Sequence, residues 1–274
     1  MSRSIVRGAA AVVLLAAAPA CAPEGRAGDG KGTQAAADAR EGACEIVTRH
    51  LSLPAAVEES SGAALSRRHP GLLWTHEDSG NEPELLGIDA EGRLAAAMPV
   101  AGARNDDWED LALGPCAEGD CLYIADVGDN EKGRRHVSLW VVPEPAPGDP
   151  TTRPAREYRA RFPGGRTPDT EALVVLPGGE VFLVTKGNQG PIELYRWPTP
   201  LAAGGVAELE RVRELAPEPS QTGDRVTGAG ASPDGRWVAV RTYGQLAFFR
   251  AAELAGAAGR PALEFDLTPL GEAQ

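Results

Sequence analysis

A repeated unit of strand-forming segments constrains the fold of this 274-residue chain more than any other feature. Each copy opens with a short acidic or small-residue motif and continues, 11 to 15 residues later, into an apolar run that ends in polar residues. The opening motifs are ESSGAAL, WEDLAL, TEALVV and TGAGAS, which begin at Glu59, Trp108, Thr170 and Thr227. The apolar runs centre near Trp74, Leu122, Phe182 and Val238, which lie 48, 60 and 56 residues apart.

These runs are rich in Val, Leu and aromatic residues, and Gly, Pro, Asp and Asn bound them, as is typical of β-strands. A period near 50 residues with about four short strands per copy is the signature of a β-propeller blade. A large β-sandwich with similar hairpins is the alternative, and the kept order of motifs within each copy favours the propeller. The sequence therefore predicts an all-β fold, a β-propeller over residues 44–274. Near the C-terminus, GEA resembles the TEA that opens the third copy, so we expect a truncated chain that lacks one or two blades.

Residues 1–21 have the pattern of a signal peptide, with Arg3 and Arg7 before an apolar run that is too short to span a membrane. Small residues directly precede Cys21, as in bacterial lipoprotein signals, which predicts lipidation of this cysteine; simple secretion is the alternative. Residues 22–43 are small and polar and predict a flexible tether. The expected location is extracytoplasmic: the cell surface or periplasm for a lipoprotein, and otherwise the medium.

The formal net charge of −12, without a cluster of Lys and Arg, argues against nucleic acid or an anionic membrane surface as a partner. The only membrane contact expected is the N-terminal lipid. The partner classes left are a protein, a glycan or a small anionic ligand, bound by a monomer.

Two cysteines, Cys116 and Cys121, bracket a tight turn, AEGD, between two strand-like segments. In an oxidising compartment this spacing predicts a disulfide. A zinc site is the poorer interpretation, because no other Cys or His lies at ligand spacing. Cys44 is then left either as a free thiol or with a partner outside this chain.

Several phrases of the chain resemble those of a largely uncharacterised group of secreted bacterial propeller proteins and lipoproteins. They are ESSG…LWTHEDSG, N-DWEDLA, YIADVGDN, TEAL, VTGA…SPDG and VRTY, and the resemblance covers the chain from about Glu58 to the C-terminus. The resemblance implies a propeller, six-bladed when complete, and supplies no reaction. A looser similarity is to calcium-dependent six-bladed propeller hydrolases of the paraoxonase and gluconolactonase type, in which carboxylate and Asn side chains hold calcium in the central tunnel. The Glu109-Asp110 pair matches their inner Glu-Asp step, and no catalytic residue is carried over.

The acidic motif that opens each copy is where the innermost strand of a blade should lie. Under that model carboxylates from different blades converge on the tunnel, with Thr227 in the fourth position; they are Glu59, Glu109, Asp110 and Glu171. Converging carboxylates repel one another unless they are protonated or neutralised by a cation. Calcium suits best, because it accepts six to eight oxygen ligands in flexible geometry. The alternative is that these carboxylates bond to backbone amides of neighbouring blades or pair with Lys186 and Arg241.

Two loops share an acidic residue, a Gly and an Asn after a strand, and both are candidates for metal or ligand binding. Their candidate residues are Asp78 and Asn81 in EDSGN, and Asp129 and Asn130 in DVGDN. Because Asp and Asn also stabilise turns, a purely structural role is the alternative.

His76, beside Asp78, is the best candidate general base, and a structural histidine is the alternative. Lys186 and Arg241 end equivalent strands and are candidates for binding an anionic group. The first functional hypothesis is a non-enzymatic propeller that binds a partner and holds calcium. The second is a metal-dependent hydrolase of the lactonase or phosphoester type.

Overall fold

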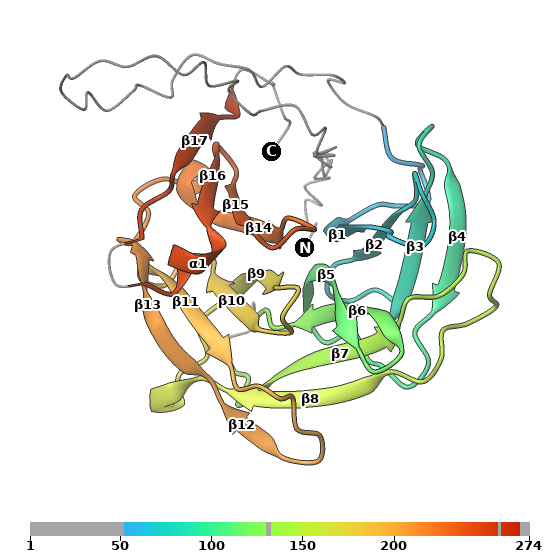
Figure 1. The fold of residues 1–274 in the computed structure, drawn as a ribbon, viewed down its shortest axis with the longest axis horizontal. Coiled ribbons are helices and arrows are strands. Elements are labelled where there is room, and N and C mark those ends of the chain that lie inside the picture. The colour runs from blue at the N-terminus through green and yellow to red at the C-terminus, as the bar shows by residue number, and fades with distance from the viewer. Residues whose placement is uncertain (1–51, 130–132, 257–258, 269–274) are drawn as a thin grey trace, which may run out of the picture.

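Four mainly antiparallel sheets arranged around a common axis make up the structure, a computed structural model that describes residues 52–129, 133–256 and 259–268 (Figure 1). Each sheet is one blade. The strands β1, β5, β9 and β14 lie nearest the axis (Figure 1) and begin at or next to the four opening motifs of the sequence repeat. The predicted β-propeller is therefore confirmed, and the β-sandwich alternative is wrong.

Within each blade the strands pair in chain order, from the axis outwards. Blade 1 contains β1 (Ser60–Leu65), β2 (Leu73–Glu77), β3 (Glu84–Ile88) and β4 (Leu94–Pro99). Blade 2 contains β5 (Trp108–Cys116), β6 (Gly119–Asp126), β7 (Val137–Pro143) and β8 (Arg156–Arg161). Blade 3 contains β9 (Thr170–Val175), β10 (Val181–Thr185), β11 (Ile192–Trp197) and β13 (Glu210–Ala216). Blade 4 contains β14 (Val226–Ala231), β15 (Trp237–Thr242), β16 (Gln245–Arg250) and β17 (Leu263–Asp266).

The remaining elements are short. Strand β12 (Val206–Glu208) precedes β13 in the chain but pairs parallel with β8, so it links the outer edges of blades 2 and 3. The helical segments are η1 (Pro163–Gly165), η2 (Thr222–Asp224) and α1 (Ala251–Leu254). Among the described residues, none of these helices has the length and apolar character needed to cross a membrane.

Apolar side chains fill the spaces between successive blades. Alternate residues of a strand point to opposite faces of its sheet, so a strand in a middle blade needs apolar residues on both faces. In β9, Leu173 and Val175 pack in a cluster with blade 2, whereas Ala172 and Val174 pack in a cluster with blade 4. This two-sided burial explains why TEALVV and VFLVT read as almost continuous apolar runs.

The predicted disulfide is present at the hairpin between β5 and β6. Cys116 and Cys121 are bonded, with their Cα atoms 5.8 Å apart, and close the turn at the end of blade 2 opposite the start of β5. The predicted signal peptide and tether, together with Cys21 and Cys44, lie outside the described residues.

Candidate metal centre

A β-bulge near the start of the inner strands sets the direction of the candidate site residues. In β5 the register against β6 shifts between Trp108 and Asp110, which leaves Glu109 as the extra residue. In β9 the corresponding shift against β10 leaves Glu171 as the extra residue. Bulges bend the strand and re-aim a side chain, and they are common next to functional sites. Glu109 and Glu171 therefore occupy equivalent bulge positions on the inner strands of adjacent blades.

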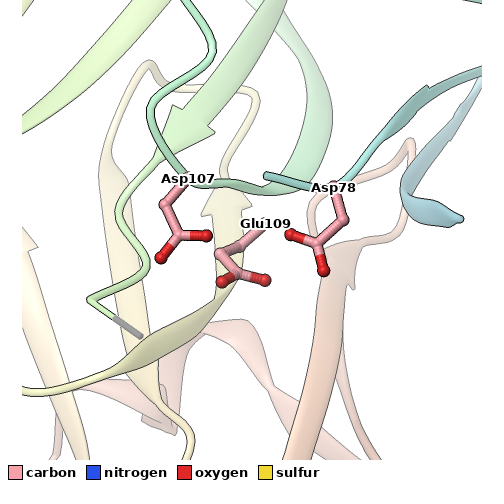
Figure 2. A group of neighbouring side chains, drawn as sticks. All are labelled: Asp78, Asp107 and Glu109. Carbon is pink, nitrogen blue, oxygen red and sulfur yellow. The ribbon is translucent and has the colours of Figure 1, made fainter. Parts of the chain in front are cut away.

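Three carboxylates from blades 1 and 2 meet at this end of the inner strands, and we name Asp78, Asp107 and Glu109 the first trio (Figure 2). One oxygen of each lies within 4.8 Å of the others. Figure 2 shows Glu109 between the two aspartates. The side chain of Asn105 joins the two loops, because its Nδ2 donates to the Asp78 carbonyl oxygen at 2.9 Å while its Oδ1 accepts from the backbone N–H of Trp108 at 3.1 Å.

A second trio overlaps the first and consists of Glu109, Asp169 and Glu171, again with oxygens within 4.8 Å of one another. Lys186, directly after β10, donates from Nζ to Glu171 Oε1 and lies 3.8 Å from Asp169 Oδ2. Asn188 donates from Nδ2 to the same Asp169 oxygen at 2.7 Å. Glu109 is thus shared by two groups of carboxylates, one of which contains a lysine ammonium.

Gly128, in the loop after β6, allows the first trio to assemble. A Cβ atom at this position would lie 2.2 Å from Glu109 Oε1 and 2.5 Å from Asp107 Cγ, much closer than contact distance. The backbone N–H of Gly128 also donates to the Asp107 carbonyl oxygen at 3.2 Å. The Gly of the DVGDN loop is therefore required by the close approach of the carboxylates to the chain.

Burial and mutual repulsion raise the pKa values of these carboxyl groups. Burial is the largest cause for Glu109, whose pKa lies far above its ordinary value, and Glu171, Asp78 and Asp107 raise it further. Burial likewise raises the pKa of Glu171 to about 7, although Lys186 opposes the rise. The pKa of Asp78 is raised mainly by burial and then by its acidic neighbours. Without a bound cation the cluster therefore retains protons near neutral pH.

Glu109 supplies the observation that points to a ligand. Its side chain is only 4% exposed, yet Oε1 has no hydrogen-bond partner among the described atoms. A buried carboxylate oxygen without a partner is costly, so a native structure normally satisfies it with protein, water or an ion. Two oxygens bound to one calcium ion at about 2.4 Å are at most about 4.8 Å apart. The spacing of the first trio therefore fits a calcium ion, with water completing the coordination.

The other predicted metal ligands lie differently. Asp110 is buried, but its carboxylate accepts backbone N–H groups of three inner strands and belongs to neither trio; the donors are Leu111 at 2.8 Å, Leu173 at 2.7 Å and Ala229 at 3.2 Å. Burial raises the pKa of Asp110 to about 7, and these three N–H groups oppose the rise. Glu59 is exposed before β1 and accepts from Asn81 Nδ2 at 3.3 Å, so it too lies outside both trios.

Some of the predicted ligand-binding residues lie in the carboxylate cluster and others lie outside it. Asp78 and Lys186 belong to the cluster. The Asp129 carboxylate accepts the backbone N–H groups of Gly133 and Arg134 at 2.9 and 3.1 Å, as in a turn. Arg241 donates from Nη1 to Thr227 Oγ1 at 3.0 Å. Asn130 lies outside the described residues.

His76, the predicted general base, is fully buried in β2. Its Nδ1 lies 3.0 Å from the Glu77 carbonyl oxygen, and its ring meets the Trp108 ring edge-on at 5.4 Å between centroids. Burial lowers the pKa of His76 to about 4 despite nearby backbone carbonyls, so the ring is neutral at physiological pH. Its Nε2 is buried without a hydrogen-bond partner among the described atoms, and its catalytic role stays a prediction.

Two members of the cluster, Asp107 and Asp169, were not predicted from the sequence. Both stand two residues before a bulged glutamate, so the pattern D-x-E occurs as DWE in blade 2 and DTE in blade 3. That repetition is the signal that could have identified them. The first copy, with Val57 before Glu59, and the fourth, with Arg225 before Thr227, lack it.

No family model and no curated protein matches this chain. Solved propeller-type structures are similar to it. Hydrazine synthase from Kuenenia stuttgartiensis is 16% identical over 82% of this chain and 53% of that chain, with a TM-score of 0.38. A 6-phosphogluconolactonase-like protein from Bacteroides uniformis is 16% identical over 79% of this chain and 59% of that chain, with a TM-score of 0.38. The PQQ-bound aldose sugar dehydrogenase from Streptomyces coelicolor is 14% identical over 76% of this chain and 80% of that chain, with a TM-score of 0.37. The chain spans between a half and three fifths of the first two, and these scores carry no activity over to it.

Proposed function

We propose that this chain is an extracytoplasmic β-propeller that binds a calcium ion at the first trio and serves as a binding or scaffold protein. Asp78, Asp107 and Glu109 would hold the ion. The observation that carries the proposal is the buried Glu109 oxygen without a hydrogen-bond partner, placed where three carboxylates from two blades converge.

The ion would join blades 1 and 2 at the inner end of the propeller, because its ligands come from a loop of one blade and the first strand of the next. Binding to the folded state alone stabilises a protein by RT ln(1 + [L]/Kd). A calcium ion would also offset the repulsion that burial imposes on these carboxylates. The cation would therefore fix the geometry of this end of the inner strands, and a protein, glycan or small anionic ligand would be the partner. Lipidation of Cys21 would tether the propeller, as a monomer, to a membrane.

The hydrolase alternative requires a general base within hydrogen-bond reach of a substrate beside the ion. The candidates for this base are His76, which is buried and packed against Trp108, and a carboxylate of the cluster. The burial of His76 favours a binding role over catalysis by this histidine. A panel of lactones and phosphoesters tests this alternative. Turnover that the Glu109→Gln substitution abolishes, with the fold intact, would favour the hydrolase.

Thermal unfolding with and without calcium tests the proposed ion. Calcium at about 100 times its Kd adds about 2.7 kcal/mol, which should raise the melting temperature over that in chelator by about 5–10 °C. Glu109→Gln is the matched control and should remove the difference. A melting temperature that is the same in chelator and in millimolar calcium would overturn the proposal.

A further inference from the structure

Lys186 is bonded to the second trio, whereas its charge acts on Glu109 and Asp78 of the first trio without an ion pair. Lys186 pairs with Glu171 and Asp169 in the second trio. Within the described part of the chain, no Lys or Arg forms an ion pair with Asp78 or Glu109. The cluster therefore has one half with a positive charge of its own and one half whose central oxygen, Glu109 Oε1, is buried without a hydrogen-bond partner.

Backbone contacts fix Lys186 in this position. Its N–H donates to the Asp169 carbonyl oxygen at 2.9 Å, and its own carbonyl oxygen accepts the N–H of Val226, at the start of β14, at 3.0 Å. The backbone of Lys186 is therefore held between the segments that lead into the inner strands of blades 3 and 4. Burial lowers the pKa of Lys186, but Glu171, Asp169 and Glu109 raise it above its ordinary value overall, so the ammonium stays charged.

We propose that the Lys186 ammonium takes the place of a second cation, so that the five-carboxylate cluster binds a single divalent ion, at the first trio. This inference rests on the proposed function, and it adds the stoichiometry of the site and the residue that determines it. An ammonium and a divalent ion compete for the same oxygens, because each is stabilised by converging carboxylates.

Removing the ammonium should convert the second trio into a second ion site. The three carboxylates of that trio have the same oxygen spacing as the first, and Glu109 would bridge the two ions. Ions that share a bridging carboxylate in two-metal sites lie about 3.5–4 Å apart. Mn²⁺ ions at that separation couple magnetically, so Mn²⁺ serves as a probe of both number and proximity.

The experiment compares the wild-type chain with Lys186→Met, which keeps an unbranched side chain and removes the charge. Arg196→Met is the matched control, because Arg196 lies on the next strand of the same blade and pairs with Glu210 at 3.0 Å, away from the cluster. Mn²⁺ binding is counted by titration calorimetry, and electron paramagnetic resonance reports coupling between bound ions.

The wild-type protein and Arg196→Met should bind one Mn²⁺ with an uncoupled spectrum. Lys186→Met should bind two with a coupled spectrum, and its first ion should bind about tenfold more tightly, because a like charge nearby has been removed.

Two ions in the wild-type protein would overturn the inference and leave the proposed function standing, and this result does not depend on the folding of any variant. One ion in both the wild type and folded Lys186→Met would overturn it as well. If the wild type bound no ion, the proposed function would fail, and the inference would fail with it.

Discussion

The two halves of the carboxylate cluster solve the same electrostatic problem in different ways. Buried carboxylates that face one another repel, and the repulsion is relieved by protonation or by a cation. In the second trio the cation is the ammonium of Lys186. In the first trio the spacing of Asp78, Asp107 and Glu109 suits an ion from solution. The proposed function implies that this propeller uses equivalent bulges of adjacent blades in two ways, for a structural ion pair at Glu171 and for a metal site at Glu109.

Asp110 offers a third solution, one residue away from Glu109. Its carboxylate is stabilised by hydrogen bonds from backbone N–H groups of β5, β9 and β14, so it ties three inner strands together. Adjacent residues of β5 therefore have different roles: Glu109 belongs to a candidate metal site, and Asp110 stabilises the packing of the inner strands.

The largest effect is expected from Glu109→Gln, because Glu109 belongs to both trios. The amide keeps the shape of the side chain but removes its charge, so calcium affinity should fall by at least about 100-fold. Stability in chelator should be unchanged or higher, because the variant no longer buries an acidic group beside four others. Calcium titration and thermal unfolding in chelator measure the two effects. Unchanged calcium affinity would show that the shared residue is not a ligand.

Asp110→Asn makes the same chemical change at the next residue and should have the opposite result. One carboxylate oxygen of Asp110 now accepts two hydrogen bonds, from the backbone N–H groups of Leu173 and Ala229. The NH₂ group of asparagine at this place would set donor against donor. We expect a loss of about 2–4 kcal/mol in the free energy of unfolding, measured with denaturant. Calcium affinity of the folded fraction should stay within a few-fold of the wild type. A stable variant that has lost calcium binding would instead assign Asp110 to the metal site.

The pH dependence of stability should differ with and without calcium. The pKa values of Glu171 and Asp110 are raised to about 7, so between about pH 5 and 7 the native state binds more protons than the unfolded state. Stability then falls as pH rises through this window. We expect the melting temperature in chelator to decrease from pH 5 to pH 8, and saturating calcium to reduce the decrease, because the ion stabilises the ionised forms. Parallel pH profiles in the two conditions would contradict this coupling.

The smallest effect is expected from Gly128→Ala, which acts mainly on the first trio. The added methyl group would force Glu109 and Asp107 to shift, because it would lie 2.2 and 2.5 Å from their atoms. Calcium affinity should fall about tenfold, as for other changes that disturb the orientation of metal ligands. Gly133→Ala, in the same loop and with no atom within 4 Å of its Cβ position, is the control and should bind as the wild type does.

The fold was largely predictable from the sequence, because a blade is a local unit. The order of motifs within each copy identified the inner strands at Trp108 and Thr170, and the short span between Cys116 and Cys121 identified the disulfide. Each of these depends on residues close in the chain.

The site was less predictable, because it depends on contacts between blades. The motifs suggested that Glu109 and Glu171 converge, and the structure brings them together. The sequence left open whether the carboxylates pair with Lys186 or accept backbone N–H groups of neighbouring blades, and the structure shows the first for Glu171 and the second for Asp110. The motif WEDLAL predicted one site for Glu109 and Asp110, but neighbouring residues of a strand point to opposite faces, and the structure leaves Asp110 outside both trios.

The most direct test of the metal centre is a crystal structure of the protein soaked in Mn²⁺ or Ca²⁺, with anomalous diffraction used to locate the ion. The expected result is a single peak bounded by oxygens of Asp78, Asp107 and Glu109, with Lys186 still bonded to Glu171. A map at millimolar ion concentration with no peak at the cluster, or with its peak at Asp110, would contradict the proposed centre.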